Sequence, residues 1–415
     1  MINKNFYDTC TLLNHYNRIN FSEKFYISEV TLEELENIKT SFKKSNDLKY
    51  NARKVLNLLC DASNMEVIRK FHPFVINNDK KILLDASSIK EEICFITDDL
   101  NCYLLAKEKY ELKAFLGKNF FNTKLENAYT GYKEVSLSDI KLANFYGEDL
   151  PKNKNTFKLL INEYLLIKRD NEIIDEYIWT GEKYVKVPYR TFQSDMFGDI
   201  KPFKEDVYQK IAMDALVRNK ITVISGPAGT GKSLLSFGYM FSLLDRGEID
   251  KIIIFCNTVA TKGAAKLGFY PGSRTEKLLD SQIGNFLTSK LGHKMAVEKM
   301  IDDGQLILLP MSDLRGFDTS GMNAAIYITE AQNLDIELMK LALQRIGEDS
   351  ICIIDGDARG QVDLDAYAGT NNGMNRLSEV FRGDDCYGEV VLKNIHRSHI
   401  AKLAQKMWLT DKVVF

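Results

Sequence analysis

The stretch GPAGTGKS, residues 226–233, constrains the fold of this chain more than any other part of its sequence. It follows the apolar, β-branched run ITVIS and precedes the helical run LLSFGYMFSLL. This strand–loop–helix context is the one that a phosphate-binding loop requires. Glycines let the loop fold closely around a phosphate, so that several N–H groups point inward at the N-terminus of the helix. A glycine-rich turn with a chance lysine is the alternative, and the flanking strand and helix argue against it.

The loop predicts a site for ATP with Mg²⁺. Lys232 would reach the β and γ phosphates, and Ser233 would offer its hydroxyl to the metal. Gln209 lies upstream, where its amide could read the edge of the adenine. The predicted nucleotide-binding residues are Gly226, Pro227, Ala228, Gly229, Thr230, Gly231, Lys232, Ser233 and Gln209.

The whole chain predicts an α/β protein with two domains and a connector, since 415 residues exceed one ordinary core. Residues 203–415 hold six apolar runs separated by helical stretches, which predicts one doubly wound sheet. The runs are ITVISG, KIIIFC, LILLP, AAIYIT, SICIID and EVVLK. Residues 1–145 alternate short apolar runs with helices, which predicts a small parallel α/β/α domain. Between them, 146–202 predicts a small antiparallel β connector that ends in a linker, TFQSDMFGDIKP.

Three residues after the phosphate loop are candidates for catalysis. Glu330 ends the run AAIYIT and could polarise the attacking water, and Gln361 could sense the γ phosphate. Arg397 could neutralise the charge of the transition state. Each has a structural alternative: a helix N-cap for Glu330, a turn for Gln361 and a surface ion pair for Arg397. Together, after a strict phosphate loop, they favour a hydrolytic site.

Four acids in the N-terminal domain follow or end short β-like runs. Asp8, Glu34, Asp98 and Asp99 would lie at the carboxyl edge of a parallel sheet, where such folds place their sites. Clustered carboxylates repel one another unless a cation neutralises them, so the cluster predicts Mg²⁺ or Mn²⁺ and metal-activated water. The alternative is helix capping, since Thr31-x-x-Glu34 fits a capping box and Thr97 precedes two acids.

Composition excludes several classes of protein. The net charge of −2 gives no overall basic excess, so any nucleic-acid site must be local. The seven scattered cysteines form no CxxC pair, which favours a reducing compartment over disulfides or structural zinc. No window approaches about 18 uninterrupted apolar residues, so we expect a cytoplasmic protein without a signal peptide or membrane span.

Several motifs in the C-terminal half resemble the PhoH family. They are GPAGTGKS, LGFYPGS (267–273), LRGF (314–317), EAQN (330–333), RIG (345–347) and GD…QVDL (356–364). The resemblance implies a P-loop ATPase with a single RecA-like core, similar to the first motor domain of superfamily 1 helicases. Two positions depart from the family. Thr329 stands where the family has Asp before the glutamate, and GDARGQ has one extra residue before Gln361, which displaces it from the usual spacing.

The N-terminal segments DTCTLL, EEL and TDDLN resemble the PIN nuclease domain in order and spacing, and GYKEVSLSD near 131–139 resembles its tail. The resemblance implies that Asp8, Glu34 and Asp99 are the core metal ligands, with Asp98 as a fourth.

A PIN domain followed by a PhoH-type ATPase implies RNA unwinding or translocation coupled to ribonuclease cleavage. Single-stranded RNA is the expected partner, and TKGAAKLGFY (261–270) offers basic and aromatic residues for it. Since one motor core is visible, a homo-oligomeric ring, hexameric by resemblance, would supply the second wall of the nucleotide site. Arg274 and Arg315 are candidates for an arginine acting in trans. Two alternatives stay open: a regulator whose PIN-like domain binds without cleaving, and an ATP-binding protein with no action on nucleic acid.

Thr329 predicts a weakened ATPase rather than an inactive one. Its hydroxyl can bind a water of the Mg²⁺ shell, but without charge, which costs about 1–3 kcal/mol. In RecA-like sheets the strand ending in Asp355 lies beside both the phosphate-loop strand and the Thr329 strand. We therefore expect Asp355 or Asp357 to face the Mg²⁺ shell in its place.

Overall fold

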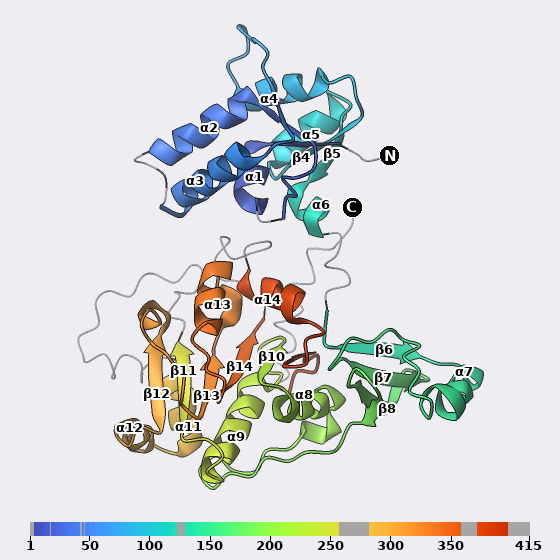
Figure 1. The fold of residues 1–415 in the computed structure, drawn as a ribbon, viewed down its shortest axis with the longest axis vertical. Helices are drawn as coiled ribbons and strands as arrows, with labels where there is room; N and C mark the ends of the chain where they lie inside the picture. The colour runs from blue at the N-terminus through green and yellow to red at the C-terminus, as the bar shows by residue number, and fades with distance from the viewer. Residues whose placement is uncertain are drawn as a thin grey trace. The chain divides into compact units, whose positions relative to one another are not determined.

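The structure is a computed structural model that describes residues 4–16, 18–41, 44, 46–122, 129–256, 282–357 and 372–396. The chain forms two compact units, one made mainly of residues 1–128 and the other mainly of residues 129–415 (Figure 1).

The first unit is a three-layer α/β/α domain, as predicted. Its five strands are all parallel, in the order β3-β2-β1-β4-β5. Apolar side chains of α1, α2 and α3 pack on one face of the sheet, and those of α4 and α5 pack on the other. The described elements are β1 (Lys4–Tyr7), α1 (Thr9–His15), β2 (Phe25–Ser28), α2 (Glu29–Thr40), α3 (Asn46–Asp61), β3 (Met65–Ile68), α4 (Asn78–Ser87), β4 (Ile93–Thr97), α5 (Leu100–Glu108), β5 (Lys113–Leu116) and α6 (Gly117–Asn122).

Helix α2 begins earlier than a capping box at Thr31 would place it. Its N-cap is Ser28, whose hydroxyl accepts a hydrogen bond from the Val30 N–H at 3.1 Å. Thr31 lies inside the first turn and is buried. Glu34 is therefore a mid-helix residue, and the capping alternative for Thr31 and Glu34 is wrong.

The second unit begins with a small mixed sheet of order β6-β7-β8-β9. Strands β7, β8 and β9 are antiparallel, as expected, but β6 runs parallel to β7. Strand β6 lies in the segment 131–139 that resembles a PIN tail, so the structure places this segment in the second unit. The described elements here are β6 (Tyr132–Ser136), α7 (Asp139–Asn144), a π-helix η2 (Phe145–Asp149), β7 (Tyr164–Arg169), β8 (Glu172–Trp179) and β9 (Tyr184–Lys186).

The rest of the second unit is a doubly wound domain with a six-stranded parallel sheet of order β12-β11-β13-β14-β10-β15. Each of the six apolar runs supplies one strand, which confirms that prediction. Helices α8, α9, α11 and α12 cover one face, and α13 and α14 cover the other. The described elements are a 3-10 helix η3 (Phe203–Glu205), α8 (Val207–Arg218), β10 (Ile221–Ser225), α9 (Lys232–Asp245), β11 (Lys251–Cys256), α11 (Gln282–Leu291), α12 (Lys294–Asp302), β12 (Leu306–Pro310), 3-10 helix η4 (Met311–Asp313), β13 (Ala324–Ile328), 3-10 helix η5 (Ala331–Asn333), α13 (Ile336–Leu343), β14 (Ile351–Gly356), α14 (Gly373–Phe381) and β15 (Tyr387–Val391).

The segment 191–202, expected to be a linker, packs into the core of the second unit. Phe192 and Ile200 exchange two backbone hydrogen bonds of 2.9 and 2.8 Å. The Phe197 ring stacks on Phe241 of α9 with centroids 5.1 Å apart. The buried aromatic side chains make this segment part of the domain.

Within the described residues, no helix combines the length and apolar character needed to cross a membrane.

Candidate functional site

The phosphate loop joins β10 to α9 in the predicted geometry. Gly231 has φ +98° at the start of α9, a left-handed conformation that glycine adopts without strain. A Cβ atom there would also lie 2.8 Å from Gln209 Nε2. The Lys232 ammonium donates to the carbonyl of Gly226 at 2.6 Å. The lysine therefore lies across the loop, beside the place that a phosphate would take.

Gln209 is buried beneath this loop. Its Nε2 donates to the Thr230 carbonyl at 2.8 Å, and its Oε1 accepts from the Phe203 N–H at 2.8 Å. The amide thus holds the loop against η3. Its contact with adenine stays a prediction.

A residue that the sequence did not single out, His396, also contacts the loop. Its backbone N–H donates to the Gly229 carbonyl at 2.9 Å. Its Nε2 lies 2.6 Å from Asp206 Oδ2, at the N-cap of α8. The chain after β15 is therefore fixed to the phosphate loop at the residue before Arg397. Arg397 and Gln361 themselves lie outside the described residues, as do Arg274 and the segment 261–270.

Asp355 contacts the residue that would bind Mg²⁺. It lies at the end of β14, which pairs with both β10 and β13, as expected. The Ser233 hydroxyl donates to Asp355 Oδ2 at 3.1 Å, and the Tyr327 hydroxyl donates to the same oxygen. The Glu330 N–H donates to Asp355 Oδ1 at 3.2 Å. Burial and the adjacent Asp355 raise the pKa of Tyr327 well above its usual value, so Tyr327 stays a neutral donor. A buried carboxylate thus faces the loop from the strand next to Thr329.

Glu330 is held at the corner after β13 in a strained backbone conformation. Its φ of +50° is left-handed, which costs a non-glycine residue about 1–3 kcal/mol and is common at functional sites. Glu330 stands at the N-cap position of η5, as the structural alternative had it, but its side chain makes no capping hydrogen bond there. Instead Gln332 Nε2 donates to Glu330 Oε2 at 2.6 Å.

Gln332 links Glu330 to β14. Its Oε1 accepts from the Asp357 N–H at 3.1 Å, and its backbone carbonyl accepts from Asn372 Nδ2 at 2.8 Å. Gln332 therefore positions the carboxylate of Glu330, a role that the EAQN motif contained but that sequence reasoning did not assign.

In the first unit, Asp8 forms the centre of an acidic edge. It is the N-cap of α1, where Oδ1 accepts from the Thr9 N–H at 2.6 Å. Its Oδ2 accepts from Thr97 Oγ1 at 2.7 Å and from Cys10 Sγ at 3.0 Å. Burial, with a smaller contribution from the charge of Glu34, raises the pKa of Asp8, although these hydrogen bonds lower it. A cation bound beside Asp8 would therefore stabilise its ionised form.

Glu34 is joined to Asp8 through one residue. Thr9 Oγ1 donates to Glu34 Oε2 at 2.6 Å. The other oxygen of Glu34 accepts from Asn78 Nδ2 at 2.9 Å. Helix α4 therefore reaches the acidic edge, which sequence reasoning did not anticipate.

Asp79 is the acid that sequence reasoning missed. It lies in the first turn of α4, beside Asn78. Burial raises the pKa of Asp79, and the charges of Asp99 and Glu34 raise it further. The acidic edge thus joins Asp8, Glu34, Asp79 and Asp99.

Asp98 contacts a different set of side chains. His15 Nε2 lies 2.7 Å from Asp98 Oδ2, and Asn14 Nδ2 donates to the same oxygen at 3.1 Å. These contacts turn Asp98 toward the end of α1, whereas Asp99 caps α5 by accepting from the Cys102 N–H at 2.7 Å. Thr97 is therefore not the cap of α5, and Asp79 is a better fourth member of the acidic edge than Asp98.

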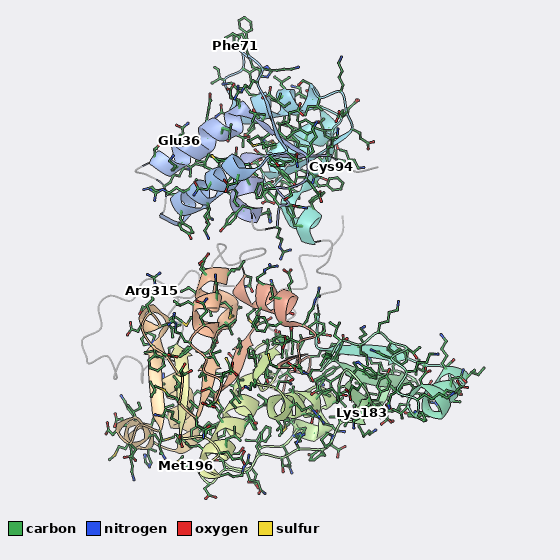
Figure 2. All side chains as sticks on the ribbon, viewed as in Figure 1. Glu36, Phe71, Cys94, Lys183, Met196 and Arg315 are labelled. Carbon is green, nitrogen blue, oxygen red and sulfur yellow. The ribbon has the colours of Figure 1, made fainter. Side chains whose placement is uncertain are left out.

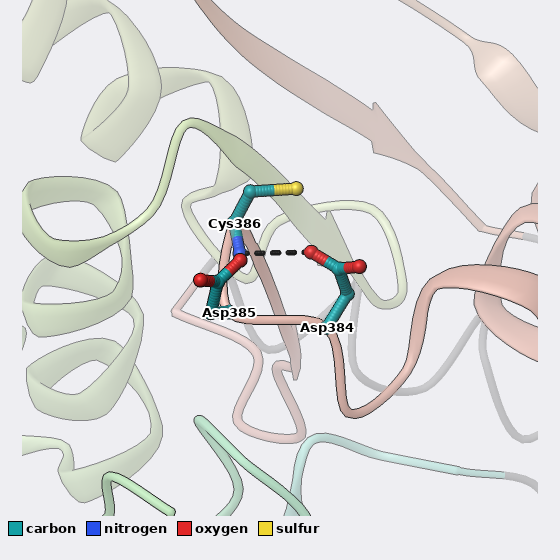
Figure 3. A group of neighbouring side chains, drawn as sticks. All are labelled: Asp384, Asp385 and Cys386. Carbon is teal, nitrogen blue, oxygen red and sulfur yellow. Dashed lines mark hydrogen bonds between the residues drawn. The ribbon is translucent and has the colours of Figure 1, made fainter.

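The residues of both sites have the chemistry that Mg²⁺ and Mn²⁺ favour, namely carboxylates and hydroxyls. The four acids predicted as ligands do not converge within 4.8 Å. In the described part of the chain, one group of three His, Cys, Asp or Glu side chains has its ligand atoms within 4.8 Å of one another. This group is Asp384, Asp385 and Cys386 (Figure 3). They are neighbours in an exposed turn before β15, where Asp384 accepts from the Cys386 N–H at 3.1 Å, so we assign them no metal.

Comparison with known proteins agrees with this geometry. Residues 200–408, just over half of the chain, match the family described as PhoH-like protein. The chain belongs to the PhoH-like family. Residues 6–114 match the PIN domain, so this PhoH-like chain joins a PIN domain to a P-loop domain.

Two relatives align with most of this PhoH-like chain. Protein PhoH2 of Bacillus subtilis is 27% identical over 351 residues, which cover 79% of this chain and 77% of that protein. Protein PhoH2 of Thermobispora bispora is 30% identical over 354 residues, which cover 80% and 74%. A PhoH-like protein of Bacillus subtilis is 32% identical over 179 residues, 43% of this chain and 54% of that one.

Proposed function

We propose that the PhoH-like domain hydrolyses ATP to move along or unwind single-stranded RNA, and that the PIN domain cleaves this RNA with Mg²⁺ or Mn²⁺. The observation that supports this is the presence in one chain of two acidic sites. One is Asp355 with Glu330 beside a phosphate loop, and the other is the edge of Asp8, Glu34 and Asp99.

In the ATPase site, each side chain has a separate role. Lys232, which now donates to the carbonyl of Gly226, would instead bind the β and γ phosphates when ATP is present. Ser233 and Asp355 would hold Mg²⁺, which supplies positive charge beside the transferred phosphate. Glu330, fixed by Gln332, would orient the attacking water and accept its proton.

In the PIN site, Asp8, Glu34 and Asp99 would hold the cation, with Asp79 beside them. Bound Mg²⁺ or Mn²⁺ lowers the pKa of a water and places it for attack on a phosphodiester. Thr9 already orients Glu34 through its hydroxyl, and Thr97 orients Asp8. These hydroxyls keep the carboxylates in place while they act together.

We further propose that a ring of identical chains, hexameric by analogy with the family, closes the nucleotide site. This idea is supported by the one P-loop sheet that the described residues form, since motors with one core close nucleotide between subunits. Arg315 or Arg274 of a neighbouring chain would then stabilise the transition state, while Arg397 would act within its own chain.

The test is cleavage of end-labelled single-stranded RNA by wild type and Asp8→Asn, with Mg²⁺ or Mn²⁺. Cleavage by wild type and its loss in Asp8→Asn is the expected result. If wild type leaves several RNAs intact with either metal, the PIN domain does not cleave. RNA-stimulated ATP hydrolysis would then favour the second function, an ATP-driven regulator whose PIN domain only binds, because Lys232, Ser233 and Asp355 lie in the second unit and do not depend on the acidic edge.

A further inference from the structure

The segment between β3 and α4 presents two phenylalanines to solvent. Phe71 is 89% exposed and Phe74 is 96% exposed. Figure 2 shows Phe71 at the far end of this segment, pointing away from the helices of the first unit. Burying such a ring would favour folding by about 1.5–3 kcal/mol, so two solvated rings in one turn need an explanation other than the core.

The turn that carries these rings is anchored. His72, between them in sequence, places Nε2 2.8 Å from Asp85 Oδ1. Asp85 is buried, and its other oxygen accepts from Ser28 Oγ at 2.6 Å. The Val75 N–H donates to the His72 carbonyl at 3.2 Å and closes the turn. Because the turn is fixed at its centre, the two rings would lose little backbone freedom on binding a ligand.

The segment leaves the same edge of the sheet that carries the acids. Strand β3 ends at Ile68, and it is parallel to the strands that end before Asp8 and Asp99. After the turn, the chain enters α4 at Asn78, which binds Glu34. The turn that carries the rings thus leads into the helix that forms part of the acidic edge.

Two cations accompany the rings. Arg69 and Lys70 immediately precede Phe71, and both are exposed. Arg69 lies 3.4 Å from Glu29, an exposed pair that a phosphate could replace. Two exposed cations followed by two exposed rings suit the phosphates and bases of a single strand.

We propose that residues 69–77 form a stacking platform for single-stranded RNA beside the PIN site. Phe71 and Phe74 stack on unpaired bases, and Arg69 and Lys70 bind the adjoining phosphates. The platform selects unpaired RNA, because a base in a duplex is already stacked on both faces. This inference rests on the proposed action of the chain on RNA and adds a substrate-binding surface to it.

The test compares wild type with Phe71→Ala/Phe74→Ala, using single-stranded RNA that carries 2-aminopurine, in EDTA so that no cleavage occurs. Wild type should quench the fluorescence on binding, and the variant should lose this quenching and bind about tenfold to a hundredfold more weakly. With Mn²⁺, the KM for cleavage should rise by a similar factor while kcat changes little. Phe71→Tyr/Phe74→Tyr keeps both rings and should behave as wild type.

Tyr50→Ala is the matched control, since Tyr50 is an exposed ring beside Lys54 on α3 and should leave RNA binding unchanged. Equal quenching and affinity in wild type and Phe71→Ala/Phe74→Ala would overturn the platform. So would a change of oligomeric state in that variant with RNA binding intact, because the rings would then join copies of the chain. Binding with quenching but without cleavage would contradict the proposed ribonuclease and support the platform.

Discussion

At the scale of single residues, we propose that Asp355 on the neighbouring strand takes the place of the carboxylate that Thr329 lacks. Asp355 accepts from Ser233 at 3.1 Å and from the Glu330 N–H at 3.2 Å. The sequence predicted only that Asp355 or Asp357 would face the Mg²⁺ shell, from the order of strands in RecA-like sheets. It could not predict the role of Tyr327, whose hydroxyl reaches Asp355 only once the two strands are paired.

Moving the carboxylate back to Thr329 should restore a site that loses Asp355. Mg²⁺ should strengthen nucleotide binding in wild type. Asp355→Asn should weaken binding in Mg²⁺ by about tenfold to a hundredfold, because a charge-assisted contact is lost. Thr329→Asp/Asp355→Asn should recover it. Titration of a fluorescent ADP analogue, in Mg²⁺ and in EDTA, measures both.

Glu389→Gln is the control for the loss of a buried carboxylate. Glu389 accepts from Ser378 at 2.5 Å and from the Tyr387 hydroxyl at 2.8 Å, much as Asp355 does, but it lies on β15. The Glu389→Gln variant should bind nucleotide as wild type does, both in Mg²⁺ and in EDTA. An unchanged Mg²⁺ effect in Asp355→Asn would show that Asp355 does not face the metal.

Gln332 should act on hydrolysis rather than on binding. Gln332→Ala frees the Glu330 side chain, and misplacing a catalytic group by about 1 Å can lower the rate about a hundredfold. We expect kcat for ATP to fall about tenfold to a hundredfold with nucleotide affinity unchanged. Steady-state hydrolysis gives kcat, with Glu330→Gln as the reference for a lost base. An unaltered kcat in Gln332→Ala would mean that Glu330 needs no support.

Asp8 should make the first unit sensitive to divalent cations. Its folded-state pKa is raised, so the ionised form costs stability at neutral pH, and a bound cation offsets this cost. Wild type should melt at a higher temperature in Mn²⁺ than in EDTA. Asp8→Asn keeps an acceptor for the Thr9 N–H and should lose the Mn²⁺ effect without a lower Tm in EDTA. A Mn²⁺ shift that persists in Asp8→Asn would place the cation elsewhere.

At the scale of elements, apolar runs predicted the strands well because a buried parallel strand must be apolar on both faces. Pattern alone failed where tertiary contacts decide. Strand β6 pairs with β7 rather than with the first sheet, and the aromatic side chains of 191–202 bury a segment that reads as a linker. Asp79 was missed because its position in the acidic edge depends on the docking of α4.

Strand β6 is fixed to the P-loop domain through Glu134. This carboxylate accepts from Lys168 of β7, from Lys393 after β15, and from the Tyr208 hydroxyl of α8 at 2.8 Å. Burial alone would raise the pKa of Glu134, but these hydrogen bonds outweigh burial and lower it to about 2. The small sheet and the P-loop domain therefore share an ionic contact as well as a core.

Acid should release this contact in a defined pH range. Because the folded-state pKa is lowered, ionised Glu134 stabilises the fold above its ordinary value near 4.5, and this contribution disappears as pH falls through about 2. Glu134→Gln should unfold more easily than wild type at neutral pH. As the pH falls from about 4.5 to about 2, it should lose less stability than wild type. Urea unfolding, followed through Trp179 of β8 after Trp408→Phe, measures it. Glu182→Gln, in the exposed turn before β9, is the control, and a variant with the wild-type pH profile would contradict the assignment.

At the scale of the whole molecule, the P-loop motif and the acids after β-like runs predicted the two kinds of site. The sequence could not predict the platform of residues 69–77, because an aromatic residue in a sequence does not reveal whether it is buried. Nor could it predict that Gln209 holds the phosphate loop, since an amide carries no mark of its partner.

The coupling that we propose is that ATP hydrolysis feeds RNA to the PIN domain. An RNA that has a single-stranded tail and a downstream duplex, labelled within the paired region, tests this coupling. Wild type with Mn²⁺ should cut inside the paired region only when ATP is present, whereas Glu330→Gln should cut only the tail. Equal cutting of the paired region with and without ATP, or by Glu330→Gln, would contradict the coupling of the two domains.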